Sequence, residues 1–123
     1  MLALEDLKEY TKQKEMKEFM ASAFQVDVET FKPFTILIGY QSVGAWGCDS
    51  SNFFLVREKK TGKLFYNYGS HCSCYGFEEQ WEPSETELAY LKSDKFYVST
   101  GGYDGDSDGN RQAILGYIKK LKK

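Results

Sequence analysis

The segment from Phe34 to Tyr40 reads Phe-Thr-Ile-Leu-Ile-Gly-Tyr and is apolar at almost every position. A strand with one face in water alternates apolar and polar side chains, whereas this run has no polar face. Pro33, directly before it, closes off any helix that precedes it. The pattern therefore predicts a strand that is buried on both faces.

Three further segments predict strands. Residues 52–59 and 63–68 are rich in aromatic and β-branched side chains, and the Lys60-Thr61-Gly62 link between them is short enough for a hairpin. Residues 95–100, Lys-Phe-Tyr-Val-Ser-Thr, have the same composition. We therefore expect an antiparallel sheet of about four strands.

Helical patterns occur before, within and after these strands. Residues 4–24 predict one amphipathic helix, or two pieces broken near Thr11, and residues 110–121 predict a C-terminal helix. Ser84 and Glu87 have the spacing of a capping box, which predicts the start of a short helix ending near Ser93. The element order indicates an α+β fold, with the N-terminal, short and C-terminal helices packed on one face of the sheet.

Size and charge exclude several classes of protein. The chain has 123 residues, which favours a single domain over residues 1–123, and a net charge of −2, which gives no electrostatic support for nucleic-acid binding. No apolar run approaches the roughly 20 residues of a transmembrane helix, and the charged start is unlike a signal peptide. Three cysteines, an odd number, predict a reducing cytoplasm rather than a disulfide framework.

The most distinctive motif covers residues 69–83, Gly-Ser-His-Cys-Ser-Cys-Tyr-Gly-Phe-Glu-Glu-Gln-Trp-Glu-Pro. It resembles a His-Cys-Ser-Cys-x-Gly-(Leu/Phe)-Glu-x-Gln-Trp-x-Pro motif of small uncharacterised bacteriophage and prophage proteins. The resemblance covers about a seventh of the chain. It implies a phage origin and, since no activity is assigned to that family, no particular chemistry.

The same motif carries the residues best suited to bind a metal ion. His71, Cys72 and Cys74, together with Cys48 from the preceding glycine-rich loop, supply three thiols and one imidazole, the ligand set of a closed tetrahedral zinc site. Alternatively, one cysteine is a nucleophile with His71 as its base. In the third interpretation the cysteines pack as small buried apolar residues.

A second candidate for metal binding lies in the acidic loop before the C-terminal helix. Asp104, Asp106 and Asp108 alternate with other residues and are followed by glycine, as in the opening of a calcium loop. The twelfth position of that loop, where an EF-hand has glutamate, is Leu115. A calcium or magnesium site completed from elsewhere is one interpretation, and a solvated loop before a helix is the other.

Twenty aromatic residues are many for a chain of this length, and a group of them falls in predicted loops. Tyrosine and tryptophan are enriched where partners dock. The candidate partner-binding residues are Trp46, Tyr75, Trp81 and Tyr103. The alternative is that the surplus forms a second core layer beneath the N-terminal helix.

These observations favour a non-catalytic protein that acts by binding a host protein, for example a component of a defence system, in the cytoplasm of the infected or lysogenic bacterium. The alternative is a metal- or thiol-dependent small enzyme, or a small-molecule-binding protein, centred on Cys48, His71, Cys72 and Cys74. One zinc ion is the favoured cofactor and calcium the less favoured one. We also expect a homodimer.

Overall fold

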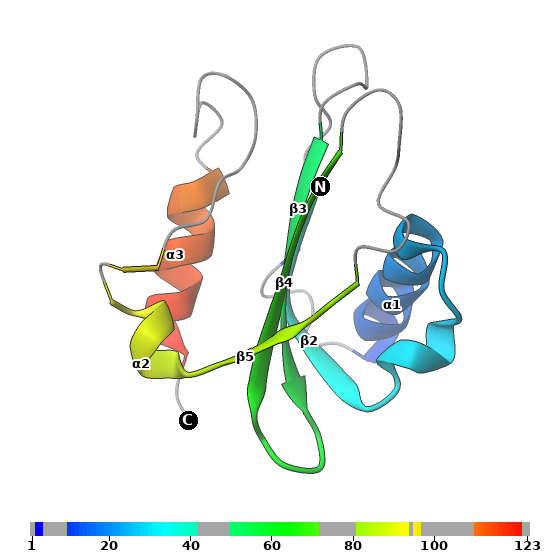
Figure 1. The fold of residues 1–123 in the computed structure, drawn as a ribbon, viewed down its shortest axis with the longest axis horizontal. Helices are drawn as coiled ribbons and strands as arrows, with labels where there is room; N and C mark the ends of the chain where they lie inside the picture. The colour runs from blue at the N-terminus through cyan, green and yellow to red at the C-terminus, as the bar shows by residue number, and fades with distance from the viewer. Residues whose placement is uncertain are drawn as a thin grey trace.

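The computed structural model describes residues 2–3, 10–41, 50–71, 81–93, 95–96 and 110–121. Five strands hydrogen-bond in chain order, each antiparallel to the next (Figure 1). They are β1 (Leu2–Ala3), β2 (Phe34–Gln41), β3 (Ser50–Glu58), β4 (Leu64–His71) and β5 (Ser84–Thr86). The helical elements are α1 (Tyr10–Phe24), the 3-10 helix η2 (Val28–Phe31), α2 (Leu88–Leu91) and α3 (Asn110–Lys120). The α+β class, with an N-terminal, a short and a C-terminal helix, is confirmed.

The long helices and the hairpin follow their sequence patterns. α1 occupies the predicted N-terminal segment from Tyr10 onward and ends where Gln25 adopts a left-handed conformation, with φ of 53°. Residues 4–9 lie outside the described residues. The hairpin between β3 and β4 turns at Gly62, whose φ of 74° suits glycine.

One local prediction around the short helix is wrong, and a second falls mostly outside the described residues. Ser84 does not cap a helix but begins β5, and α2 begins only at Leu88, with no side-chain hydrogen bond from its N-cap residue Glu87. The predicted strand over residues 95–100 is absent at Lys95 and Phe96, and residues 97–100 lie outside the described residues. Ser84 pairs with Tyr66 at the edge of β4. This tertiary contact outweighs the local capping pattern.

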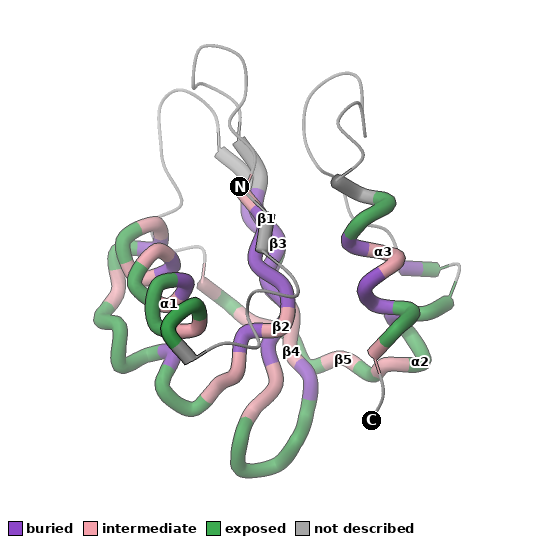
Figure 2. The backbone as a smooth tube through the Cα atoms, turned by 180° about the vertical axis from the view of Figure 1, so that it is seen from behind, coloured by how far each residue is buried: buried purple, intermediate pink, exposed green. Residues whose placement is uncertain are grey.

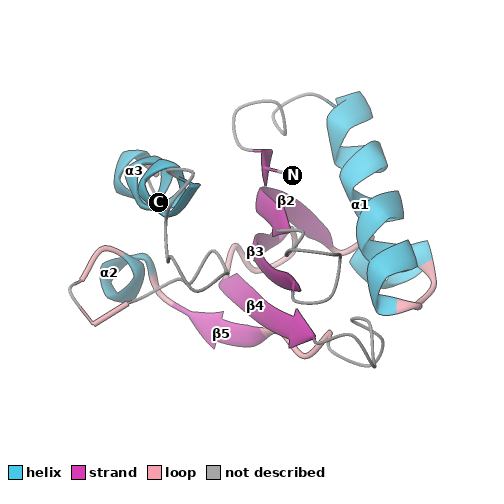
Figure 3. Ribbon diagram, turned by 90° about the horizontal axis from the view of Figure 1, so that it is seen from above, coloured by secondary structure: helices cyan, strands magenta, loops and turns pink. Residues whose placement is uncertain are grey.

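The sheet has helices on both faces, in contrast to the expected single covered face. α1 and η2 lie against one face, while α2 and α3 lie on the other side of the sheet (Figures 1 and 3). Each face has its own apolar cluster. On the α3 face the buried members are Ile38, Tyr40, Phe53, Leu55, Leu64, Leu91, Phe96, Ile114, Tyr117 and Ile118. On the α1 face they are Met16, Met20, Phe24, Phe31, Ile36, Phe54 and Val56.

A β-bulge in β2 allows that strand to serve both clusters. Ile36 pairs with Val56 and Ile38 pairs with Leu55, so β2 advances two residues where β3 advances one. Ile36 and Ile38 would otherwise point to the same face, because side chains alternate along a strand. The extra residue sends Ile36 to the α1 face and Ile38 to the α3 face. The prediction of a strand buried on both faces is confirmed (Figure 2).

Two contacts hold α1 against β2. The Gln13 side chain donates from Nε2 to the Ile36 carbonyl at 2.6 Å, and its Oε1 accepts from the Ile36 N–H at 2.9 Å. Further along, Met16 packs over Gly39, where a Cβ would lie only 2.6 Å from the methionine Cε and 2.7 Å from its Sδ. The absence of a side chain at position 39 therefore allows the helix to approach the strand closely.

Replacing Gly39 by alanine is expected to destabilise the fold by about 1–3 kcal/mol, because the new methyl group overpacks the buried Met16 side chain. The cost should be smaller in a Met16→Ala background, since the two changes are coupled through one contact. Urea denaturation of the two single variants and the double variant measures this coupling.

Gly116→Ala is the matched control. Gly116 lies within α3, and a Cβ there would have no heavy atom within 4 Å. This substitution should stabilise the protein by about 0.5–1 kcal/mol, because alanine favours the helix. Equal effects of the two glycine substitutions would contradict the assigned close approach of α1.

Candidate functional site

An open cleft of about 570 Å³ with a strongly charged lining lies beside α1. Four lysines line it together with a single acidic residue, Glu29, so the local net charge is +3. The lysines are Lys14, Lys17, Lys32 and Lys59. We call this surface the lysine cleft. Its charge is opposite in sign to the net charge of −2 carried by the whole chain.

The fold gathers these lysines from three separate segments. Lys14 and Lys17 are three residues apart on α1, which places them on the same side of the helix. Lys32 follows η2, and Lys59 follows β3. The Lys59 N–H donates to the Pro33 carbonyl at 2.8 Å, and this bond holds the end of β3 beside the segment that carries Lys32.

Lys17 is the electrostatically perturbed member of the cleft. Partial burial lowers the pKa of its ammonium group, and the neighbouring positive charge of Lys59 lowers that pKa further. Within the described residues neither lysine forms an ion pair with a carboxylate. The only ion pair inside the cleft joins Lys32 to Glu29 at 3.7 Å, and both of these side chains are largely exposed. The arrangement attracts anions.

A second cleft, of about 720 Å³, lies near the hairpin on the side of α2. Its charged lining residues are two cations and two anions, namely Arg57, Lys63, Glu85 and Glu87. Lys63 and Glu85 already pair with each other at 3.2 Å. Because its charges are balanced, this cleft has no preference for a ligand of either sign, and the lysine cleft is the stronger candidate site.

The predicted cysteine and histidine site falls mainly outside the described residues, which exclude Cys48, Cys72 and Cys74. The backbone of His71, the last residue of β4, pairs with Ser50, the first residue of β3. The segments that carry the three cysteines therefore join the same end of one strand pair. Over the described part of the chain, no group of three His, Cys, Asp or Glu side chains is arranged to hold a metal ion.

The other predicted site residues are described only in part. Asp104, Asp106 and Asp108, like the aromatic residues Trp46, Tyr75 and Tyr103, lie outside the described residues. They remain predictions.

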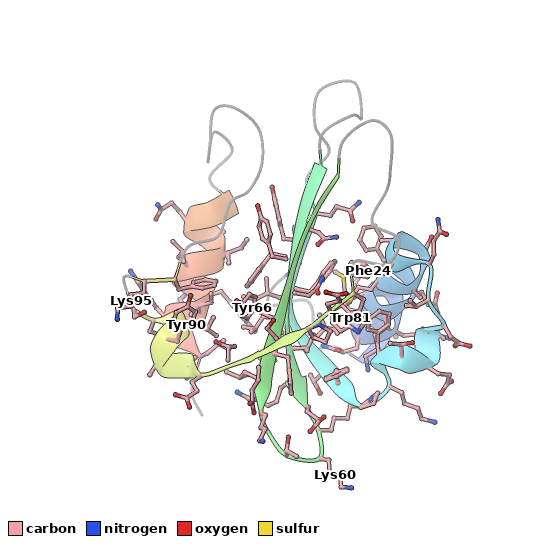
Figure 4. The ribbon with its side chains drawn as sticks, in the orientation of Figure 1. Phe24, Lys60, Tyr66, Trp81, Tyr90 and Lys95 are labelled. Carbon is pink, nitrogen blue, oxygen red and sulfur yellow. The ribbon has the colours of Figure 1, made fainter. Side chains whose placement is uncertain are left out.

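Trp81 is described, and it packs against the α1 face of the sheet. Its ring centroid lies 5.5 Å from that of Phe24, 4.9 Å from that of Phe31 and 6.2 Å from that of Phe34. Figure 4 shows the tryptophan beside Phe24 on this side of the molecule. This partly buried position matches the interpretation of the aromatic surplus as core. Its predicted role in partner binding has not been tested.

The sequence pattern did not identify the lysine cleft. On α1, Lys14 and Lys17 fall on the charged side of an amphipathic pattern, and such a side is usually no more than a solvated surface. Lys32 and Lys59 are 27 residues apart along the chain, and only the pairing of Phe34 with Glu58 brings them close. The one local signal was the density of lysines near Pro33 and the hairpin.

Comparison with protein-family models, with curated proteins and with solved structures finds no match to this chain. Among the helices in the described ranges, none combines the length and apolarity needed to cross a membrane.

Lys59→Gln is expected to raise the pKa of Lys17 toward the ordinary lysine value of 10.5, because it removes a positive charge beside it. In the folded wild type the lowered pKa means that charged Lys17 opposes folding. That penalty is present below the folded-state pKa and disappears as the pH rises toward 10.5. NMR titration of the lysine ¹³Cε signals measures the shift, and an unchanged Lys17 pKa would contradict the assigned proximity.

Proposed function

We propose that this protein is a small, non-catalytic phage accessory protein that acts by binding a host protein, and that the lysine cleft is its docking surface. The observation that carries the proposal is the concentration of four lysines around one acid in a concave surface of a chain whose net charge is negative. The resemblance of residues 69–83 to phage and prophage proteins supports the setting.

The cleft has the properties of a recognition surface rather than of a solvated patch. Lysines spread over a surface keep a protein soluble, whereas lysines gathered in a cleft concentrate their field and speed association with a complementary partner. Their backbones are held by α1, which is fixed to β2, and by the hydrogen bond between Lys59 and Pro33. A partner would therefore meet lysines whose backbone positions are already set by the fold.

Reversal of two cleft charges tests this proposal. Immobilised wild-type protein is expected to retain a host protein from a bacterial lysate at physiological salt. The double variant Lys17→Glu/Lys59→Glu should retain at least about tenfold less of that protein, because the introduced carboxylates would repel an acidic partner surface. Quantitative mass spectrometry of the retained proteins, followed by binding of the purified candidate, measures the difference.

The matched control is Lys60→Glu/Lys95→Glu. It makes the same change in net charge at two exposed lysines outside the cleft lining, one at the hairpin and one after α2 (Figure 4). Circular dichroism verifies that both double variants are folded. If no host protein is retained, or if both variants retain it equally, the proposal is wrong.

A metal- or thiol-dependent enzyme or small-molecule binder around Cys48, His71, Cys72 and Cys74 is the second candidate, and the pairing of Ser50 with His71 favours it. Native mass spectrometry of protein purified without chelator should then show the excess mass of one zinc, lost on denaturation and in Cys72→Ala. The metal-free mass would exclude the metal-dependent form. A calcium excess would instead support Asp104, Asp106 and Asp108.

A further inference from the structure

The lining of the lysine cleft indicates the shape of its ligand. α1 contributes Lys14 and Lys17 to the lining, and the segments joined by the hydrogen bond from Lys59 to Pro33 contribute Lys32 and Lys59. Residues three apart on a helix have Cβ atoms about 5–6 Å apart. In an extended peptide, side chains two residues apart lie on the same side and are separated by roughly 7 Å. Successive acidic side chains of an extended segment, which point in opposite directions, can therefore reach both the lysines of α1 and those of the Lys59–Pro33 junction.

The net positive charge of the cleft lining favours a ligand with more than one anionic group. The Glu29 carboxylate is shared with Lys32, and it leaves three of the four positive charges uncompensated. Lys17 and Lys59 are held close together although their charges repel. Carboxylates between them would turn this repulsion into two attractive contacts.

The remaining lining favours a peptide over a small phosphate compound. Phosphate sites commonly use backbone N–H groups of a helix N-terminus or a glycine-rich loop. Lys14 and Lys17 instead lie within α1, beyond its first turn. The cleft also contains the apolar side chain of Val28, which is 40% exposed and can contact an aliphatic side chain of a peptide.

We propose that the lysine cleft binds an extended acidic segment of the partner, with glutamate or aspartate side chains directed alternately toward α1 and toward the Lys32–Lys59 side. This inference rests on the proposed function and gives the chemistry of the partner. The contacts are solvent-exposed ion pairs, so each is weak and the affinity should fall as salt rises.

Titration of the ¹⁵N-labelled protein with hexaglutamate, and with hexaglutamine as the neutral control, tests the inference by NMR. Hexaglutamate should shift the amide signals of cleft residues, and hexaglutamine should not. The variant Lys17→Ala/Lys59→Ala should bind hexaglutamate about tenfold more weakly, while Lys60→Ala/Lys95→Ala should stay within about twofold of the wild type. The inference is wrong if millimolar hexaglutamate causes no shift, or if both variants weaken binding equally.

Two further measurements separate this inference from the proposed function. Hexaglutamate should displace the captured host protein, and a DNA duplex added at the same total concentration of negative charges should bind the cleft more weakly than the peptide does. If a host protein is captured through the cleft but hexaglutamate neither binds nor displaces it, the acidic-segment inference fails and the proposed function stands. Tighter binding of the duplex also overturns the inference.

Discussion

The fold depends on a central strand that no water reaches from either side. Five consecutive residues of β3, from Asn52 to Val56, are buried, and their side chains alternate between the α1 face and the α3 face of the sheet. A strand of this kind is stable only if both faces are covered, because each exposed apolar side chain would forgo roughly 1.5–3 kcal/mol of burial. The bulge in β2 likewise places apolar side chains of the neighbouring strand on both faces of the sheet. Helices must therefore cover both faces.

The position of the candidate site follows from how α1 covers its face. Among the described residues, β1 pairs with β2 at Gly39 and Tyr40, and β2 extends from there back to Phe34. There the Gln13 amide donates to and accepts from the backbone of Ile36, as an adjacent strand would. Gln13 thereby fixes the position of Lys14 next to it and of Lys17 one turn further on. The contacts that bury the apolar face of α1 thus also set the geometry of the lysine cleft.

The amino-acid sequence predicts the strands and helices whose signals are local. The apolar run at Phe34 and the hairpin at Gly62 reflect periodicity and turn chemistry, and both predictions are confirmed. The prediction that Ser84 caps a helix is wrong, because the same residues suit both a helix N-terminus and a short edge strand. In the structure they pair with β4. The two-sided apolarity of β2 was itself inconsistent with helices on one face only. Lys32 and Lys59 could not be recognised as neighbours, because that requires the register of β2 against β3.

Among the features that oppose stability, a buried amide and a pair of neighbouring lysines differ in whether a partner can reach them. Asn52 is fully buried, and within the described part of the chain neither its Oδ1 nor its Nδ2 has a hydrogen-bond partner, at a cost of about 1–3 kcal/mol for each unsatisfied group. That cost lies in the interior, where no partner protein can relieve it. The repulsion between Lys17 and Lys59 lies on an open surface, where an incoming carboxylate can relieve it. Local conflicts of this second kind are retained where binding compensates them. The lysine pair therefore differs from the buried amide in lying where a ligand can reach it.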